Sequence, residues 1–420
     1  MSCAIMNAKR SIIRCLTLKG ELTIMAITRI IPFMLLLALF TLTVLPAHGL
    51  ADDTGEGEVR SETVRGKVIE LRQDEPDVQE ILIEVREGTF RGEEISTVHR
   101  LSGNPAQDFY FNEGERVLVW IEHMDGEVQR ALVREVTRDQ YLGYIVGFFI
   151  LSLIAIGGVK GLKTVISLGI TIFLILEILI PLIIAGLNPI PLTIIISSMI
   201  ATSSVLIIGG WNRKSAAAII GTIGGVVIAG IIAWISMDLT RLTGLSGEES
   251  QMLMYMSSEI PFDFIGLLFA GIIIGAVGAV LDIGMSIASA IEEVKKNNPA
   301  VTMKGMIKSG MNLGKDIMGT MANTLILAYT GASMSLLIVI QANNVPFSRV
   351  VNMDAIATEI VRVFAGSIGL LYAIPITAVV SAYMYRKITA EQIEATHEKE
   401  ERRKEKFRRI LFFWKKDAKK

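Results

Sequence analysis

The chain has 420 residues, of which 51% are hydrophobic and 20% are charged, and its formal net charge is -1. This composition is too apolar for an ordinary soluble protein, and the near-zero net charge indicates no particular partner. The 2 cysteines, Cys3 and Cys15, both precede the first apolar run, so a disulfide framework and a thiolate metal site are not expected. The 4 histidines lack the spacing of metal ligands, and we expect neither a metal nor another cofactor.

The N-terminal segment has the features of an export signal. An apolar run from Ile30 to Leu45 follows an arginine and is followed by small residues. This is the order of a leader sequence: a charged region, a hydrophobic core and a small-residue segment at its end. We predict that residues 1–51 form a leader, either a signal peptide or a signal anchor, because the length of the run is compatible with both. Met25 would begin a leader of ordinary length, so the coding start is either Met1 or Met25.

Residues 52–140 change to an alternation of apolar and polar side chains, for example from Val64 to Val68 and from Val117 to Ile121. A period of two indicates half-buried strands, and turn sequences such as Glu87-Gly88 separate the runs. The pattern predicts a small antiparallel β-barrel-like domain, which the leader would place outside the cytoplasm. Because the segment is acidic, we expect no nucleic acid as partner, whereas docking of a membrane or extracytoplasmic protein fits it.

Residues 141–385 consist of apolar runs, each near the ~20 residues that a helix needs to cross a bilayer. We therefore predict an α-helical polytopic membrane bundle of about seven transmembrane helices, in addition to the signal peptide or anchor. The predicted spans are Tyr144–Val159, Val165–Leu187, Ile190–Gly210, Ala216–Ile235, Ile265–Ile291, Met318–Ile340 and Ile360–Tyr385.

Lysine and arginine fall in every second loop of this region, beginning at Lys160, Arg213, Lys295 and Arg386. The positive-inside rule then places these loops and the C-terminus in the cytoplasm, with the β domain on the opposite side of a bacterial inner membrane. Residues 386–420 form a basic tail that ends in aromatic residues among cations. This pattern is typical of an interfacial helix on anionic lipid, and the alternative is a solvated helix.

Two carboxylates fall within predicted spans. Glu177 lies about halfway along its run, one turn before Pro181, and Asp282 lies in a run that contains Ser286 and Ser289 at i, i+4 and i+7 spacing. A carboxylate in lipid is costly, so both should face a protected interior and are candidates for ion or proton coupling. Asn323 is the expected polar partner, although buried polar side chains can also serve helix packing alone.

The chain contains no Walker-type phosphate loop, no His-Glu-x-x-His and no Gly-x-Ser-x-Gly elbow, and we do not expect an enzyme.

Three segments carry a resemblance to a known family: Gly186-Leu187-Asn188-Pro189, the block from Gly278 to Glu293, and the stretch from Gly319 to Leu325. On these the chain resembles the YibE/F family of multi-pass bacterial membrane proteins over nearly its full length. The resemblance implies a multi-pass membrane protein and by itself implies no substrate.

A shorter likeness, over about 60 residues, involves Asp282, Glu293, Ser309-Gly310-Met311 and Ala322-Asn323-Thr324-Leu325. It is similar to the membrane half of RND-type exporters and of SecD/SecF, in which the helix aspartate takes part in proton coupling. This chain departs from that pattern, because its β domain is far smaller and its helix number does not obviously fit one repeat.

The sequence thus predicts an ion-gradient-driven transporter or export-related permease for an unknown small solute or ion. Its coupling candidates are Glu177, Asp282, Asn323, Ser286 and Ser289. The alternative is a non-transporting membrane scaffold or accessory subunit whose β domain docks a partner. Isosteric replacement of the two carboxylates would separate these hypotheses.

Overall fold

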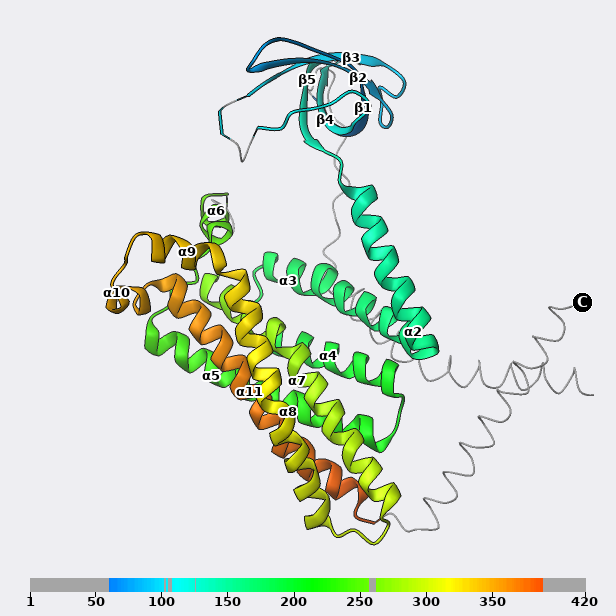
Figure 1. Ribbon diagram of the computed structural model, residues 1–420, viewed down its shortest axis with the longest axis vertical. Helices are drawn as coiled ribbons and strands as arrows, with labels where there is room; N and C mark the ends of the chain where they lie inside the picture. Colours follow the sequence, from blue (N-terminus) through cyan, green and yellow to red (C-terminus); the bar gives the residue numbers. More distant parts are fainter. Residues whose placement is uncertain (1–59, 102, 105–107, 125, 257–261, 388–420) are drawn as a thin grey trace, which may run out of the picture. The chain divides into compact units, whose positions relative to one another are not determined.

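The structure is a computed structural model, and it describes residues 60–101, 103–104, 108–124, 126–256 and 262–387. Its chain divides into two compact units, Met1–Ala155 and Ile156–Lys420, which we treat separately (Figure 1). The predicted leader and nearly all of the predicted basic tail lie outside the described residues.

The first unit contains a five-stranded antiparallel sheet with the order β3-β2-β1-β4-β5. Its strands are β1 (Arg60–Glu75), β2 (Val78–Val85), β3 (Glu94–Arg100), β4 (Arg116–Met124) and β5 (Glu127–Val136). The two edge strands approach each other, and the Thr97 hydroxyl of β3 donates to the Ala131 carbonyl of β5 at 2.6 Å. The sheet is therefore nearly closed, which confirms the prediction of a small barrel-like antiparallel fold.

Alternate residues of the strands fill the interior of this sheet. Ile81, Ile83, Val117, Val119 and Ile121 are all fully buried, as the period of two predicts. The buried Gln79 forms two hydrogen bonds with the backbone of Phe111. Its side-chain oxygen accepts from the Phe111 N–H at 3.1 Å, and its side-chain nitrogen donates to the Phe111 carbonyl at 3.4 Å. The unit thus has its own apolar core and satisfies the buried amide within it.

The helical region begins with α2 (Asp139–Phe173), which continues into the π-helical turn η1 (Leu174–Leu179) and α3 (Ile180–Ile184). The sequence predicted two separate helices here, and the structure has two helical segments that meet at a kink at Gly158, whose backbone angles are not helical (φ 56°, ψ -130°). The two segments join without a loop, and the kink lies at the second residue of Gly157-Gly158, because glycine adopts a positive φ at little cost.

The remaining elements are α4 (Pro189–Gly209), α5 (Arg213–Thr240), α6 (Glu248–Met256), α7 (Phe264–Asn297), α8 (Met303–Ala332), α9 (Met334–Ala342), α10 (Phe347–Val351) and α11 (Asp354–Tyr385). The described residues contain five helices that are long and apolar enough to span a membrane, or six if α8 and α9, bent by 63°, form one span. The structure therefore supports a multi-pass membrane protein, while the expected number of about seven spans stays a prediction.

The second unit is built around α5, α7 and α11, which pack closely because small residues line their contacts (Figure 1). A Cβ atom on Gly225 would lie 2.8 Å from both the Ala373 side chain and the Gly369 carbonyl of α11. A Cβ atom on Gly284 of α7 would lie 2.7 Å from the Thr222 hydroxyl of α5. The glycines therefore set the spacing between these helices.

Candidate functional site

The candidate site lies along the contact between α7 and α8, which run antiparallel and pack side by side (Figure 1). Two contacts fix their register: Gly275 of α7 lies against the Tyr329 hydroxyl, and Ile291 of α7 lies 2.7 Å from a Cβ position on Gly310. Asp282 falls between the two contacts on α7, and the segment from Thr320 to Thr324 falls between them on α8. The register thus places the carboxylate at about the depth of Asn323.

We call the following six residues the polar seam: Asp282, Ser286 and Ser289 of α7, and Thr320, Asn323 and Thr324 of α8. All are exposed in one copy of the chain except Ser289, which is half-buried. The neighbouring α7 positions Ile283 and Ile287 are fully buried. The spacing in the sequence therefore predicted correctly that Asp282, Ser286 and Ser289 share one side of a helix.

The polar groups of the seam differ in how they are satisfied. The hydroxyl of Thr320 donates to the Ile317 carbonyl at 2.9 Å, and that of Thr324 donates to the Thr320 carbonyl at 2.8 Å. Asp282 and Asn323 form no side-chain hydrogen bond with any described residue, and none joins them to each other. The structure thus brings the predicted partners to one depth on neighbouring helices without direct contact.

Glu177 is placed elsewhere, in the π-helical turn η1. The Ile180 N–H donates to the Ile175 carbonyl, five residues back, and Pro181 has no N–H to offer the Glu177 carbonyl. The Glu177 side chain is exposed, and η1 packs against α4. The sequence predicted that both carboxylates face a protected interior, but the described contacts do not bring Glu177 and Asp282 together in one copy of the chain.

A charged cluster extends the α7–α8 contact toward the start of α11. Arg362 forms an ion pair with Glu359 at 2.8 Å, and its guanidinium carbon lies 5.7 Å from the centre of the Tyr329 ring. The Oε2 atom of Glu359 and the Nε atom of Arg362 are shielded from solvent. Neither atom takes part in a hydrogen bond with a residue that the structure describes. The i, i+3 spacing of Glu359 and Arg362 favours this ion pair. Sequence reasoning missed Tyr329, because its position depends on the register between helices.

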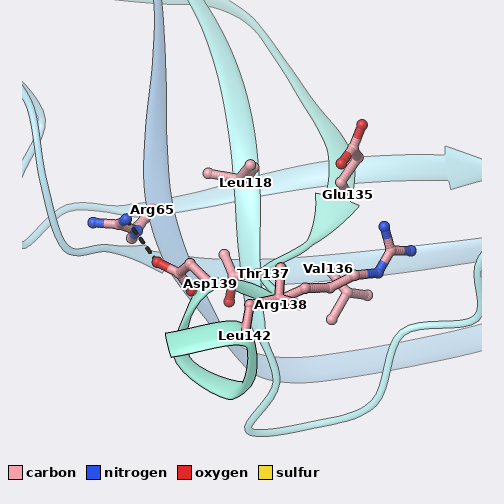
Figure 2. A pocket seen from close by; sticks show the side chains of 8 residues that line it. All are labelled: Arg65, Leu118, Glu135, Val136, Thr137, Arg138, Asp139 and Leu142. Atoms are coloured by element: carbon pink, nitrogen blue, oxygen red, sulfur yellow. Dashed lines mark ion pairs between the residues drawn. The ribbon is translucent and has the colours of Figure 1, made fainter. Parts of the chain in front are cut away.

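The first unit has a cleft of about 280 Å³ where the sheet meets α2 (Figure 2). Arg65 of β1 pairs with Glu87 at 2.9 Å and with Asp139 of α2 at 2.6 Å, and both carboxylates raise the pKa of its guanidinium. Arg116 of β4 donates to the Gln140 side chain at 2.8 Å. Arg65 and Arg116 thus attach the first turn of α2 to the sheet.

No cluster of three or more His, Cys, Asp or Glu side chains that could hold a metal ion occurs within the part of the chain that the structure describes. The chemistry that the helical unit offers is therefore that of single carboxylates, an amide, hydroxyls and one ion pair.

Comparison with known proteins identifies the second unit. A family model described as YibE/F-like protein matches residues 145–387, which is more than half of the chain and includes the polar seam, Glu177 and the Glu359–Arg362 pair. Neither the search of curated proteins nor the search of solved structures finds a match. The chain is a member of the YibE/F-like family.

Proposed function

We propose that this protein is an ion-gradient-driven transporter or export-related permease in which the polar seam carries the coupling ion. The observation that supports it is the placement of an exposed carboxylate, Asp282, on a membrane-spanning helix at the depth of Asn323 on the next helix. Aspartate at the centre of a membrane helix costs roughly 2.5–3.5 kcal/mol on insertion scales. This face of α7 is therefore expected to meet water or protein rather than lipid tails.

The composition of the seam favours a small cation such as a proton. Ser286 and Ser289 continue from Asp282 along the same helix toward the lysines at the end of α7. A row of hydroxyls next to one carboxylate can hold water and relay protons, whereas it offers little surface to a large apolar substrate.

The proposed topology has seven spans. The run Asp139–Ile184 has 46 residues, which at 1.5 Å per residue would extend about 69 Å, more than twice a ~30 Å hydrocarbon core. We therefore divide it at Gly158 into two spans, with Lys160 and Lys163 on the cytoplasmic side. With α8 and α9 as one span, every second loop is basic, which leaves the sheet outside the inner membrane and the C-terminus inside.

The central experiment replaces the seam carboxylate without changing its shape. In a bacterial strain that lacks its own copy of the gene and shows a growth defect under ion stress, wild-type protein is expected to restore growth. Asp282→Asn should abolish restoration while the protein is still inserted at wild-type levels. Asp238→Asn, which removes an exposed acid near the end of α5, is the matched control and should restore growth fully.

A flux measurement accompanies the growth assay. The purified protein is reconstituted into vesicles that contain a pH-sensitive dye, and a proton gradient is imposed. We expect wild-type vesicles to pass protons faster than vesicles with Asp282→Asn. Equal flux and equal growth with both proteins would reject a coupling role for Asp282.

The second candidate function is a membrane scaffold or accessory subunit. It is favoured by one observation: Glu177 and Asp282 do not share an enclosed interior in the described contacts of one copy. In that case Glu177→Gln and Asp282→Asn should both leave growth intact, whereas removal of the sheet should abolish it, because the sheet would dock the partner.

A further inference from the structure

A group of exposed cations and aromatic rings lies where α5 begins and α11 ends. We call Trp211, Arg213, Tyr383 and Arg386 the headgroup patch. All four side chains are exposed, Trp211 by 82% and Tyr383 by 54%. The two arginines flank the last turn of α11, because Arg213 donates to the Met384 carbonyl at 3.4 Å and Arg386 lies 4.0 Å from the centre of the Tyr383 ring.

The patch is held on a rigid turn. Asn212 accepts a hydrogen bond from the Ser215 N–H at 2.8 Å, and its side-chain amide donates to the Gly209 carbonyl at 2.7 Å. Gly210 has a φ of 75°, which is favourable for glycine and lets the chain reverse between α4 and α5. Trp211 therefore lies in this turn, between Gly210 and Asn212, and its side chain is exposed.

The cations of the patch lack a carboxylate partner. Neither Arg213 nor Arg386 forms an ion pair with any residue that the structure describes. Glu292 near the end of α7 already pairs with Lys214, the neighbour of Arg213, at 3.3 Å and with Lys296 at 3.4 Å. Glu292 is thus already engaged by two lysines and not by the arginines of the patch.

The position of Arg213 adds to this excess of positive charge. It is the first residue of α5, where the helix dipole already presents a partial positive charge. A cation at that position is unfavourable unless an anion binds beside it. Exposed tryptophan and tyrosine beside arginines are typical of the level of the lipid headgroups.

We infer that the headgroup patch binds the phosphate of an anionic phospholipid. The two guanidinium groups would hold the phosphate oxygens, and Trp211 and Tyr383 would lie at the boundary between headgroups and acyl chains. This site is separate from the polar seam and does not depend on the proposed transport function.

The test measures whether anionic lipid stabilises the protein through these two arginines. Full-length protein in detergent is mixed with either phosphatidylglycerol or phosphatidylcholine, and its unfolding temperature is recorded. We expect phosphatidylglycerol to raise that temperature for the wild type, because a ligand that binds the folded state stabilises it. The double variant Arg213→Gln/Arg386→Gln should lose most of the increase.

Lys304→Gln/Lys308→Gln is the matched control, because it removes two exposed cations from the start of α8, outside the patch. This control should keep the increase. Equal loss in both double variants would show general attraction to a charged surface and would overturn the inference. An equal increase produced by inorganic phosphate without lipid would also overturn it, since the site would then accept free anions.

A spectroscopic measurement covers the case in which the arginine variants are unstable. Of the 4 tryptophans, Trp120, Trp234 and Trp414 are replaced by phenylalanine so that Trp211 alone fluoresces. Phosphatidylglycerol with brominated chains should quench Trp211 more strongly than brominated phosphatidylcholine. Equal quenching by the two lipids would contradict a site selective for the anionic headgroup.

Discussion

Single residues determine how closely α7 and α8 approach each other. Gly275 lies against the Tyr329 hydroxyl, so that a Cβ atom at position 275 would collide with that oxygen. The neighbouring Gly278, which is exposed on the same helix, has open space at its Cβ position. One glycine is therefore required by a specific contact and the other is not.

This difference gives a prediction for a double-mutant cycle. Gly275→Ala should lower the free energy of unfolding by about 1–3 kcal/mol, the usual cost of overpacking, because Tyr329 has to move. Tyr329→Phe removes the clashing oxygen, so that the double variant should be more stable than the sum of the single effects predicts, by roughly 0.5–3 kcal/mol. Unfolding by denaturant in mixed micelles measures all four proteins.

Gly278→Ala is the control for this cycle and should change stability by at most about 1 kcal/mol, which is the helix-propensity difference. If Gly275→Ala behaves like Gly278→Ala, the register between α7 and α8 described above is wrong. Additive effects of Gly275→Ala and Tyr329→Phe would likewise contradict a contact between the two residues.

The seam shows how far the sequence could lead at this scale. The positions of Asp282, Ser286 and Ser289 on one face follow from helix periodicity alone. Thr320 and Asn323 lie at about the depth of Asp282 because of the contacts at Gly275 and Gly310. These contacts join two helices, so their register could not be predicted from the pattern of a single helix. Tyr329 was missed for the same reason.

At the level of elements, the predicted strands and the predicted helical regions were found, and the differences concern ends and breaks. The helix α8 begins at Met303, well before the predicted Met318, because its first turns are amphipathic and carry Lys304 and Lys308 rather than a continuous apolar run. The 63° bend between α8 and α9 was also not predicted, since no proline marks it.

The division of the first helical run at Gly158 can be tested by its accessibility. After Cys3 and Cys15 are replaced by serine, single cysteines are introduced at Lys160 and at Leu187, both of which are exposed positions. The proposed topology places them on opposite sides of the membrane, because one complete span separates them. We expect an impermeant thiol reagent to label Leu187→Cys from outside the cell and Lys160→Cys only in inverted vesicles.

Trp211→Cys, in the next basic turn, provides the control for the inner side and should react together with Lys160→Cys. Labelling of Lys160→Cys from outside, or absence of labelling from either side, would show that residues 139–184 do not form two spans.

At the level of the whole molecule, the nearly closed sheet has a core of its own, which includes Ile81, Ile83, Val119 and Phe111. We predict that residues 52–140 fold as an independent soluble domain and unfold cooperatively, with the circular dichroism spectrum of an antiparallel sheet. A domain of this size has only a small margin of stability, so the loss of one buried side chain should be felt strongly.

Ile83→Ala, at a fully buried position, should therefore lower the free energy of unfolding of this domain by about 2–5 kcal/mol. Ile69→Ala is the control, because Ile69 is 41% exposed on β1, and it should have a much smaller effect. Similar losses in both variants, or a domain without a cooperative transition, would contradict an independent core.

The joint between β1 and α2 has a mechanical consequence. Arg65–Asp139 and Arg116–Gln140 attach the first turn of α2 to two neighbouring strands, so a pull on the sheet reaches the helix at two points rather than one. Two separated points of attachment transmit torque as well as tension. A partner that twists the sheet would therefore rotate the first part of α2 about its own axis.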